Sequence, residues 1–357
     1  MWSYMASALG IASASDAPQD VSPSTSPPSN QDSDVERACF RLRSRGWLGR
    51  ENELYLSIPK SATVRCNVIF FPGDVQDFKM AMLAGPFADY SDYAYEAVGE
   101  LLSEKFGDTC NVWVVRPSRF KHGAYSSFDN FVTTNEYGAA TKYDPTVYAT
   151  KHLASLMQNT QATLRLQGVN VSTALPMHLL GFSKGGIVLN QLVTELVRYS
   201  FNTKRSNSGQ IRQGSSFAST RQFFSAINSM HWLDSGNGSL EGAMPTEELA
   251  LSVLSRYEQL RLFVHVTPYQ YEARTRPWIK TEVNDFVNKM DLFGADIRLI
   301  LYFEGDEGSL ASHFHILQDF EPKVPISRNA HEADHSRIFG SSTAAKLQGS
   351  EKLPFLT

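Results

Sequence analysis

Short runs of β-branched and aromatic residues recur along this chain and alternate with amphipathic stretches. The apolar runs are continuous, which is typical of strands that are covered on both faces. They predict strands at residues 67–71, 111–115, 178–182, 224–233, 261–267 and 297–303. Periodicity near 3.6 residues predicts helices at residues 91–105, 145–158, 185–199, 246–259 and 281–293.

This alternation predicts one doubly wound α/β domain, a mostly parallel sheet with helices on both faces and right-handed crossovers. We place the domain at residues 37–322, with a polar insertion at about 202–220 inside one crossover. Residues 1–36 are rich in Ser, Pro and Asp and predict a disordered leader. Residues 323–357 lose the periodicity and predict a tail that is loop or disordered.

Composition narrows the class of protein. The 357 residues are 42% hydrophobic and 20% charged, with a formal net charge of −4, which is ordinary for a globular protein. The mild acidity argues against a nucleic-acid partner, which would need clustered Lys and Arg. No apolar run approaches the roughly 18–20 residues of a membrane span, so no transmembrane segment is expected. Cys39, Cys66 and Cys110 are too scattered for a disulfide framework or a zinc site, and a reducing compartment fits them.

The N-terminal segment carries no Lys or Arg before Arg37. It therefore lacks both the charged start of a secretory signal and the Arg-rich face of a mitochondrial transit peptide. On composition alone, a cytoplasmic location is favoured.

The stretch "LLGFSKGGIVLNQLV" places Gly181-Phe182-Ser183-Lys184-Gly185 between a predicted strand and a predicted helix. Gly-x-Ser-x-Gly in this context is the nucleophile elbow of α/β-hydrolases. Side chains at Gly181 and Gly185 would collide with neighbouring backbone, and the strained turn would expose the Ser183 hydroxyl at a helix N-terminus. The partial positive charge there favours a developing oxyanion.

A second oxyanion donor is expected from the loop after an earlier strand. In "NVIFFPGDVQDF" the chain turns at Gly73, so the amide of Asp74 or Val75 would converge with that of Lys184. The carboxylate of Asp74 would oppose a developing negative charge unless it turns away. An ordinary strand-ending turn explains the same residues.

A histidine must accept the serine proton, and an acid must hold the tautomer of that histidine. In α/β-hydrolases the acid and then the histidine follow the elbow in the chain. His313 lies about ten residues beyond the last predicted strand, in an expected loop, and His315 is the alternative. His265 lies within a strand and is interpreted as a core residue with its hydrogen bonds satisfied.

Two residues compete for the role of the acid. Asp234 ends the strand "FFSAINSMHWLD" and is preferred. Glu272 follows the next strand, which is the more usual position, but Arg274 or Arg276 could simply pair with it. Asp234 could instead be a turn-forming or capping residue.

His331-Glu332-Ala333-Asp334-His335 matches the His-Glu-x-x-His motif of zinc proteases. A working zinc site needs this motif on a buried helix with an apolar back. The polar flanks "VPISRN" and "SRIFGSS" offer no such support. We therefore expect no metal site and no cofactor.

Six segments carry a family resemblance: "VIFFPGDVQ", "FDNFV", "LLGFSKGGIVLNQLVTEL", "WLDSG", "HVTPYQ" and "SHF". In this order they resemble the family of the chromosome 2 open reading frame 69 protein, over roughly residues 64–317. The resemblance implies an α/β-hydrolase-like fold, an esterase- or lipase-type serine site and a mitochondrial location. It implies Ser183 as the elbow serine, with Asp234 and His313 as its candidate partners. The Phe-Pro-Gly segment also resembles the lipid-droplet-associated hydrolases, over a shorter stretch.

Together these features predict a serine hydrolase that cleaves a lipid-like or other acyl ester or thioester through an acyl-Ser183 intermediate. The aromatic-rich segment 120–145 is expected to line the acyl pocket, although core packing explains it almost as well. A catalytically inactive binding or scaffold protein with this fold is one alternative. A serine acyltransferase is the other.

Overall fold

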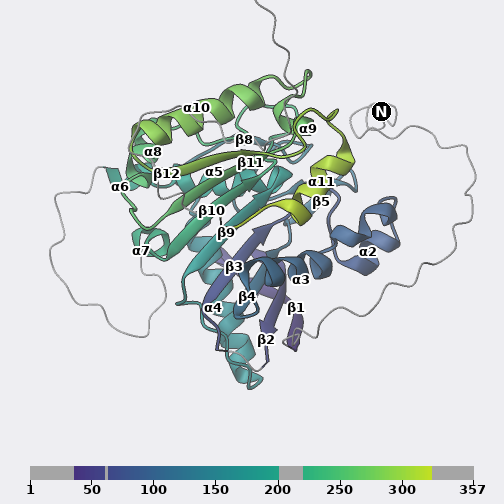
Figure 1. Cartoon of the computed structure of the whole chain (residues 1–357). Coiled ribbons are helices and arrows are strands. Elements are labelled where there is room, and N and C mark those ends of the chain that lie inside the picture. Colours follow the sequence, from purple (N-terminus) through teal and green to yellow (C-terminus); the bar gives the residue numbers. More distant parts are fainter. Residues whose placement is uncertain (1–35, 61–62, 201–219, 324–357) are drawn as a thin grey trace, which may run out of the picture. The chain divides into compact units, whose positions relative to one another are not determined.

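The computed structural model describes residues 36–60, 63–200 and 220–323 (Figure 1). The described residues up to Pro322 belong to one compact unit. The expected leader, insertion and tail lie outside the described residues, except for residues 36, 220 and 323. The motif at 331–335 also lies outside them.

The core of this unit is an eight-stranded sheet in the order β1-β2-β4-β3-β9-β10-β11-β12. The strands are β1 (Arg37–Arg45), β2 (Glu51–Pro59), β4 (Cys110–Val115), β3 (Cys66–Phe71), β9 (Met177–Phe182), β10 (Ile227–Leu233), β11 (Arg261–Val266) and β12 (Asp296–Leu301). Strand β2 runs antiparallel to both of its neighbours, and the other ladders are parallel. This order with one reversed strand is that of the α/β-hydrolase fold, so the predicted fold class is confirmed.

The two strands that the sequence reading missed lie at one edge of the sheet. In β1 the arginines alternate with apolar residues, so the strand is apolar on one face only and lacks a continuous run. The run expected at 224–233 begins as a strand only at Ile227, because α7 (Thr220–Ser225) precedes it. Phe223 and Phe224 are fully buried in that helix, so their apolarity belongs to the core and not to the strand.

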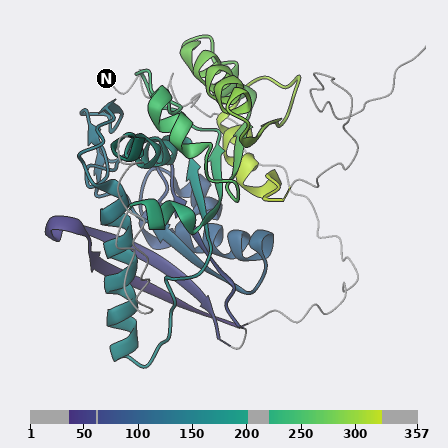
Figure 2. The same ribbon diagram turned by 90° about the vertical axis from the view of Figure 1, so that its left-hand side faces the viewer.

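Helices cover both faces of the sheet because the inner strands are apolar on both sides. In β3, Ile69 and Phe71 face one core cluster while Val68 and Phe70 face the other. The first cluster contains α4 (Ala149–Leu166), α5 (Gly186–Thr194), α7, α8 (Glu248–Leu254) and α10 (Trp278–Leu292). The second contains α3 (Tyr95–Phe106) and α11 (Leu310–Asp319). Figure 2 shows α3 and α4 on opposite sides of the β1–β2 strands.

Short elements complete the described part of the chain. They are η1 (Trp47–Gly49), α2 (Lys79–Leu83), η2 (Ala88–Tyr93), β5 (Arg119–Lys121), β6 (Tyr125–Ser127), β7 (Thr133–Thr134), β8 (Ala140–Lys142), η3 (Ser183–Gly185), α6 (Val197–Ser200) and α9 (Pro268–Tyr271). The helix expected at 185–199 is divided into η3, α5 and α6. No helix within the described ranges is both long enough and apolar enough to span a membrane.

Candidate active site

Ser183 lies in a sharp turn between β9 and α5, with a left-handed φ of 50°. A side chain on either flanking glycine would overlap the neighbouring backbone. A Cβ atom on Gly185 would lie 1.9 Å from the Phe71 carbonyl oxygen, and one on Gly181 would lie 2.7 Å from the Gly186 Cα. The close approach of strand end and helix start therefore depends on these glycines, for the steric reason expected from the sequence.

His313 and Asp234 are joined by a hydrogen bond of 2.6 Å between Nδ1 and Oδ2. Both side chains are buried, and Asp234 also accepts hydrogen bonds from the Thr267 amide (2.8 Å) and hydroxyl (2.6 Å). These bonds fix the orientation of the carboxylate. With its proton on Nδ1, the imidazole keeps a lone pair on Nε2, which is the tautomer that a general base requires.

The imidazole of His313 is held between two aromatic rings. It stacks on Phe182 and on Tyr269, each at a centroid distance of 4.6 Å. The expectation of a loop at His313 is wrong, because the residue lies in the first turn of α11. That helix begins with a capping box between Ser309 and Ser312, a local signal that the sequence reading overlooked.

The alternative acid and base lie elsewhere. Glu272 is exposed, and its Oε1 atom lies 4.0 Å from the Nζ atom of Lys280. Neither Arg274 nor Arg276 comes within 4.0 Å of a carboxylate among the described residues. His315 is exposed, whereas His313 on the same helix is buried. The structure therefore brings only Asp234 and His313 together.

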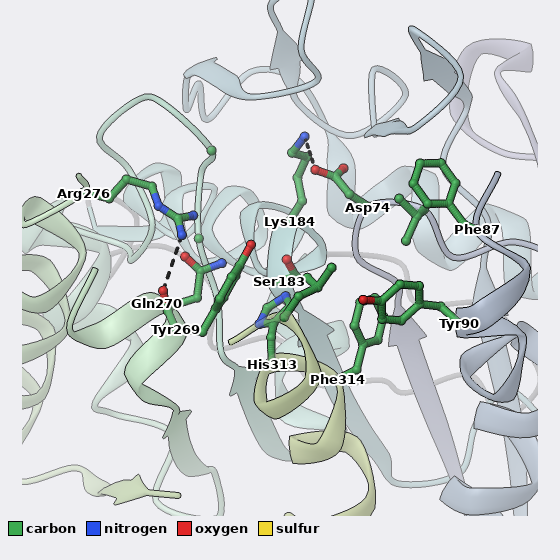
Figure 3. Close-up of a pocket in the computed structure, with 14 residues that line it drawn as sticks. Asp74, Phe87, Tyr90, Ser183, Lys184, Tyr269, Gln270, Arg276, His313 and Phe314 are labelled. Atoms are coloured by element: carbon green, nitrogen blue, oxygen red, sulfur yellow. Dashed lines mark hydrogen bonds and ion pairs between the residues drawn. The ribbon is translucent and has the colours of Figure 1, made fainter. Parts of the chain in front are cut away.

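Ser183 and His313 line the same cavity, whose volume is about 80 Å³. Figure 3 shows their side chains next to each other at its centre. Within the described chain, no hydrogen bond between the two side chains is recorded. In serine hydrolases this contact is often long without substrate and tightens in the reacting complex.

The loop after β3 reaches the elbow through Gly73, where a Cβ atom would lie 2.8 Å from that of Ser183. The Gly73 amide donates to Gln76 Oε1 at 2.8 Å, and the Val75 amide donates to the Ala124 carbonyl at 2.9 Å. Val75 is therefore not a suitable oxyanion donor, which corrects one of the two sequence-based alternatives. For the Asp74 amide, no acceptor is recorded among the described residues.

The carboxylate of Asp74 remains beside the elbow, but its charge is compensated. Oδ2 lies 2.8 Å from Lys184 Nζ, and Oδ1 accepts from the Ser126 amide at 2.7 Å. Lys184 Nζ also donates to the Tyr137 carbonyl (2.7 Å) and lies 4.8 Å from the centre of the Tyr125 ring. The Asp74 carboxylate thus does not turn away from the elbow, as the sequence analysis required. Its negative charge, which would repel an oxyanion, is instead compensated by the Lys184 ammonium group.

Segment 120–145 does not line this cavity, although Phe120 and Gly123 line a second cavity that shares Val75 and Phe87 with it. Its phenylalanines Phe128 and Phe131 are fully buried and pack edge-on against Phe71. The cavity is instead lined on one side by apolar residues from the loop after β3, the η2 region and α11. They are Val75, Phe87, Tyr90, Leu310 and Phe314.

The other side of the cavity is more polar and was not anticipated from the sequence. It is lined by Gly236, Gly238, Tyr269, Gln270 and Arg276. Gly236, Tyr269 and Gln270 fall in the resemblance segments "WLDSG" and "HVTPYQ", but neither segment by itself shows that they lie at Ser183. Only the adjacency of β9, β10 and β11 in the sheet brings them there.

Fold and site together define a protein of the α/β-hydrolase class in which a serine and a histidine line one cavity and a buried aspartate bonds to that histidine. Sequence comparison specifies the family further. The C2orf69 family model matches residues 45–174 and 167–296, and the chain belongs to this family.

Curated relatives cover most of the chain. "Mitochondrial protein C2orf69 homolog" of Danio rerio is 30% identical over 266 residues, which are 71% of this chain and 73% of that protein. "Mitochondrial protein C2orf69" of Homo sapiens is 27% identical over 304 residues, 71% of this chain and 74% of that protein.

Solved structures show more distant similarity. Esterase Est22 is 11% identical with a TM-score of 0.41, covering 79% of this chain and 76% of that chain. Carboxyl esterase 2 from Tuber melanosporum is 12% identical with a TM-score of 0.41, covering 81% and 83%. We base the fold assignment on the strand order and not on these similarities.

Proposed function

We propose that this protein is a serine hydrolase that cleaves a carboxylic ester or thioester through an acyl-Ser183 intermediate. The observation that carries the proposal is the buried His313–Asp234 hydrogen bond of 2.6 Å at the cavity that Ser183 enters from its elbow. A strained serine, an oriented imidazole and a buried carboxylate are the three parts that this chemistry needs.

In the proposed reaction, Ser183 Oγ attacks the carbonyl carbon while His313 Nε2 accepts the hydroxyl proton. The resulting oxyanion accepts hydrogen bonds from the amides of Lys184 and Asp74. His313 then protonates the leaving alcohol or thiol, and the acyl group stays on Ser183. Water attacks the acyl-serine, again with His313 as the base, and releases the acid. Asp234 stabilises the imidazolium in both halves.

A fluorophosphonate probe and a panel of short acyl esters and thioesters test the proposal. Wild type should be labelled and should hydrolyse at least one substrate. Ser183→Ala should abolish labelling and lower kcat on the order of 10⁶-fold. His313→Ala should lose activity comparably, whereas His315→Ala, its exposed neighbour on α11, should keep it.

Equal trace rates in wild type and Ser183→Ala would contradict the proposal and favour a binding protein with this fold. Transfer of the acyl group to an added alcohol, in preference to water, would show an acyltransferase instead. The same purified wild-type and variant proteins serve for all of these assays. They therefore distinguish a hydrolase, a binding protein and an acyltransferase.

We further propose a mitochondrial location, because the curated relatives carry "mitochondrial" in their names. Fractionation of cells expressing the full chain, with a protease-protection step, tests this. Recovery in the cytosolic fraction would support the location that the composition of the N-terminal segment favours.

A further inference from the structure

The cavity beside Ser183 has two walls of different chemistry (Figure 3). Phe87, Tyr90 and Phe314 lie on one side of Ser183, with Phe314 and Tyr90 packed ring to ring at 4.9 Å. Gln270 and Arg276 lie on the other side, beyond Tyr269. A ligand that spans the cavity would therefore meet an apolar surface at one end and a cationic, hydrogen-bonding surface at the other.

Arg276 brings a positive charge to this cavity, and no carboxylate in the described ranges pairs with it. Among the described residues no Asp or Glu oxygen lies within 4.0 Å of its guanidinium. Its recorded contacts are a hydrogen bond of 3.4 Å to the Tyr269 carbonyl and the Tyr269 ring at 5.4 Å. Lys184, the other cation that lines the cavity, is in contrast paired with Asp74 at 2.8 Å.

Gln270 supplies a second, independent sign of a missing ligand. Its side chain is only 4% exposed, yet Oε1 is buried without a hydrogen-bond partner. The amide is pressed against Gly236, where a Cβ atom would lie 2.9 Å from both Oε1 and Nε2. Because burial of an unpartnered amide oxygen costs free energy, a glutamine at this position is best explained by a ligand group that donates a hydrogen bond to Oε1.

We propose that the substrate carries a negatively charged group, a carboxylate or a phosphate, which accepts hydrogen bonds from Arg276, and a hydroxyl or N–H group that donates to Gln270 Oε1. The apolar part of the same substrate packs against the aromatic wall, and the scissile carbonyl lies between them at Ser183. Arginine suits this role because its planar group donates two parallel hydrogen bonds to such anions. This inference rests on the proposed hydrolase function and specifies its substrate class.

Two pairs of matched substrates test the inference. The first pair compares mono-p-nitrophenyl glutarate, with its charge on the acyl side, with p-nitrophenyl butyrate. The second compares the butyryl thioester of 3-mercaptopropionate, with its charge on the thiol side, with the thioester of methyl 3-mercaptopropionate. The ratio of kcat/KM within a pair measures the preference for charge, and the two pairs show on which side the charge is bound. Phosphorylated counterparts distinguish phosphate from carboxylate.

Wild type should prefer the charged member of at least one pair. Arg276→Gln should lower that ratio by about 10- to 100-fold, which is the range expected for a lost charge-assisted hydrogen bond. Arg276→Lys should restore part of it, since the charge remains. Arg274→Gln is the matched control, because Arg274 is exposed and does not line the cavity, and its ratio should equal that of wild type.

A binding measurement separates failure of this inference from failure of the proposed function. The Tm of Ser183→Ala and of the Ser183→Ala/Arg276→Gln double variant is measured in sodium glutarate or phosphate and, as the reference, in sodium chloride of equal ionic strength. Glutarate or phosphate should raise the Tm of Ser183→Ala more than that of the double variant. If this difference in Tm is found but no ester is cleaved, the result supports the anion site and contradicts the hydrolase proposal. Equal ratios and equal Tm shifts with and without Arg276 would overturn the inference.

Discussion

Lys184 and Asp74 form an ion pair directly beside the elbow, with their charged atoms 2.8 Å apart. The same two residues carry the backbone amides that we propose as oxyanion donors. Their side chains therefore tie together the two segments on which the donors lie. The Lys184 side chain is 4% exposed and that of Asp74 is 27% exposed, so water screens this pair only in part. A single ion pair thus removes an unfavourable charge and joins two parts of the site.

At the scale of one residue, substitution of Asp234 tests whether this side chain is the acid that orients His313. Asp234→Asn keeps the shape of the side chain but removes the charge and disturbs the hydrogen bond to His313 Nδ1. We expect kcat to fall by roughly 10³–10⁴-fold, with a smaller change in KM. Steady-state kinetics on the substrate found in the screen measures this.

Glu272→Gln is the matched control for the acid, because Glu272 was the rival position and is exposed. Its kinetics should equal those of wild type. A large loss in Glu272→Gln together with little loss in Asp234→Asn would show that the assignment of the acid is wrong.

At the scale of elements, the site depends on the contact between the end of β3 and Gly185, the last residue of η3, just before α5. Gly185 has ordinary helical backbone angles, so alanine there would be acceptable for the backbone alone. The obstacle is the Phe71 carbonyl oxygen, only 1.9 Å from the added Cβ. That oxygen belongs to the backbone of a central strand and cannot move without moving the strand.

We therefore expect Gly185→Ala to lower the free energy of unfolding by about 1–3 kcal/mol, the usual cost of overpacking. It should lower kcat as well, because Ser183 moves with the turn. Urea denaturation and kinetics on the same sample test both effects. Gly85→Ala is the milder control, since its nearest contact is 3.3 Å away. Equal stability of the two variants would contradict the steric account.

At the scale of the whole molecule, a chain of hydrogen bonds crosses the sheet through buried histidines. His231 bonds to His265 at 3.1 Å and to Ser229 at 2.8 Å, and His265 bonds to the Tyr302 hydroxyl at 3.0 Å. His265 is fully buried with its hydrogen bonds satisfied, which confirms the interpretation of it as a core residue. Burial lowers the pKa of His265 to about 3 and that of His231 well below its usual value. On the other face of the sheet, burial also lowers the pKa of His152 to about 3.

These shifts predict that acid destabilises the fold well before its carboxylates are protonated. Below pH about 6.5 the unfolded chain takes up protons on these histidines, while the native state does not until about pH 3. Stability is therefore complete above about pH 6.5 and falls as the pH falls. Each histidine contributes a slope of up to about 1.4 kcal/mol per pH unit.

Urea unfolding between pH 7.5 and 4.5 measures this slope. His265→Gln, which keeps a hydrogen-bonding side chain but cannot titrate, should show a shallower fall than wild type. His315→Gln should not change the slope, because His315 is exposed in the native state. A wild-type free energy of unfolding that is constant over this range would contradict the prediction.

The sequence by itself determined those features whose cause is local. Apolar runs located six strands, the inner strands β3, β4, β9, β10 and β11 and the edge strand β12. A strand that is covered on both faces is apolar at nearly every position. Gly181 and Gly185 located the elbow, because only glycines allow a strand end and a helix start to approach so closely. Asp234 and His313 followed from chain order after the elbow, as candidates among several.

Only the tertiary structure decided which of those candidates meet. Asp234 and His313 are 79 positions apart, and their contact depends on which strands are neighbours and in which register. The same geometry occupies the Val75 amide. Among the described residues it also keeps Glu272 more than 4.0 Å from both nearby arginines and brings Arg276 to the Ser183 cavity without a carboxylate partner. Periodicity and spacing describe one element at a time, whereas a cavity is made by side chains from several elements. Its walls become visible only when those elements are assembled.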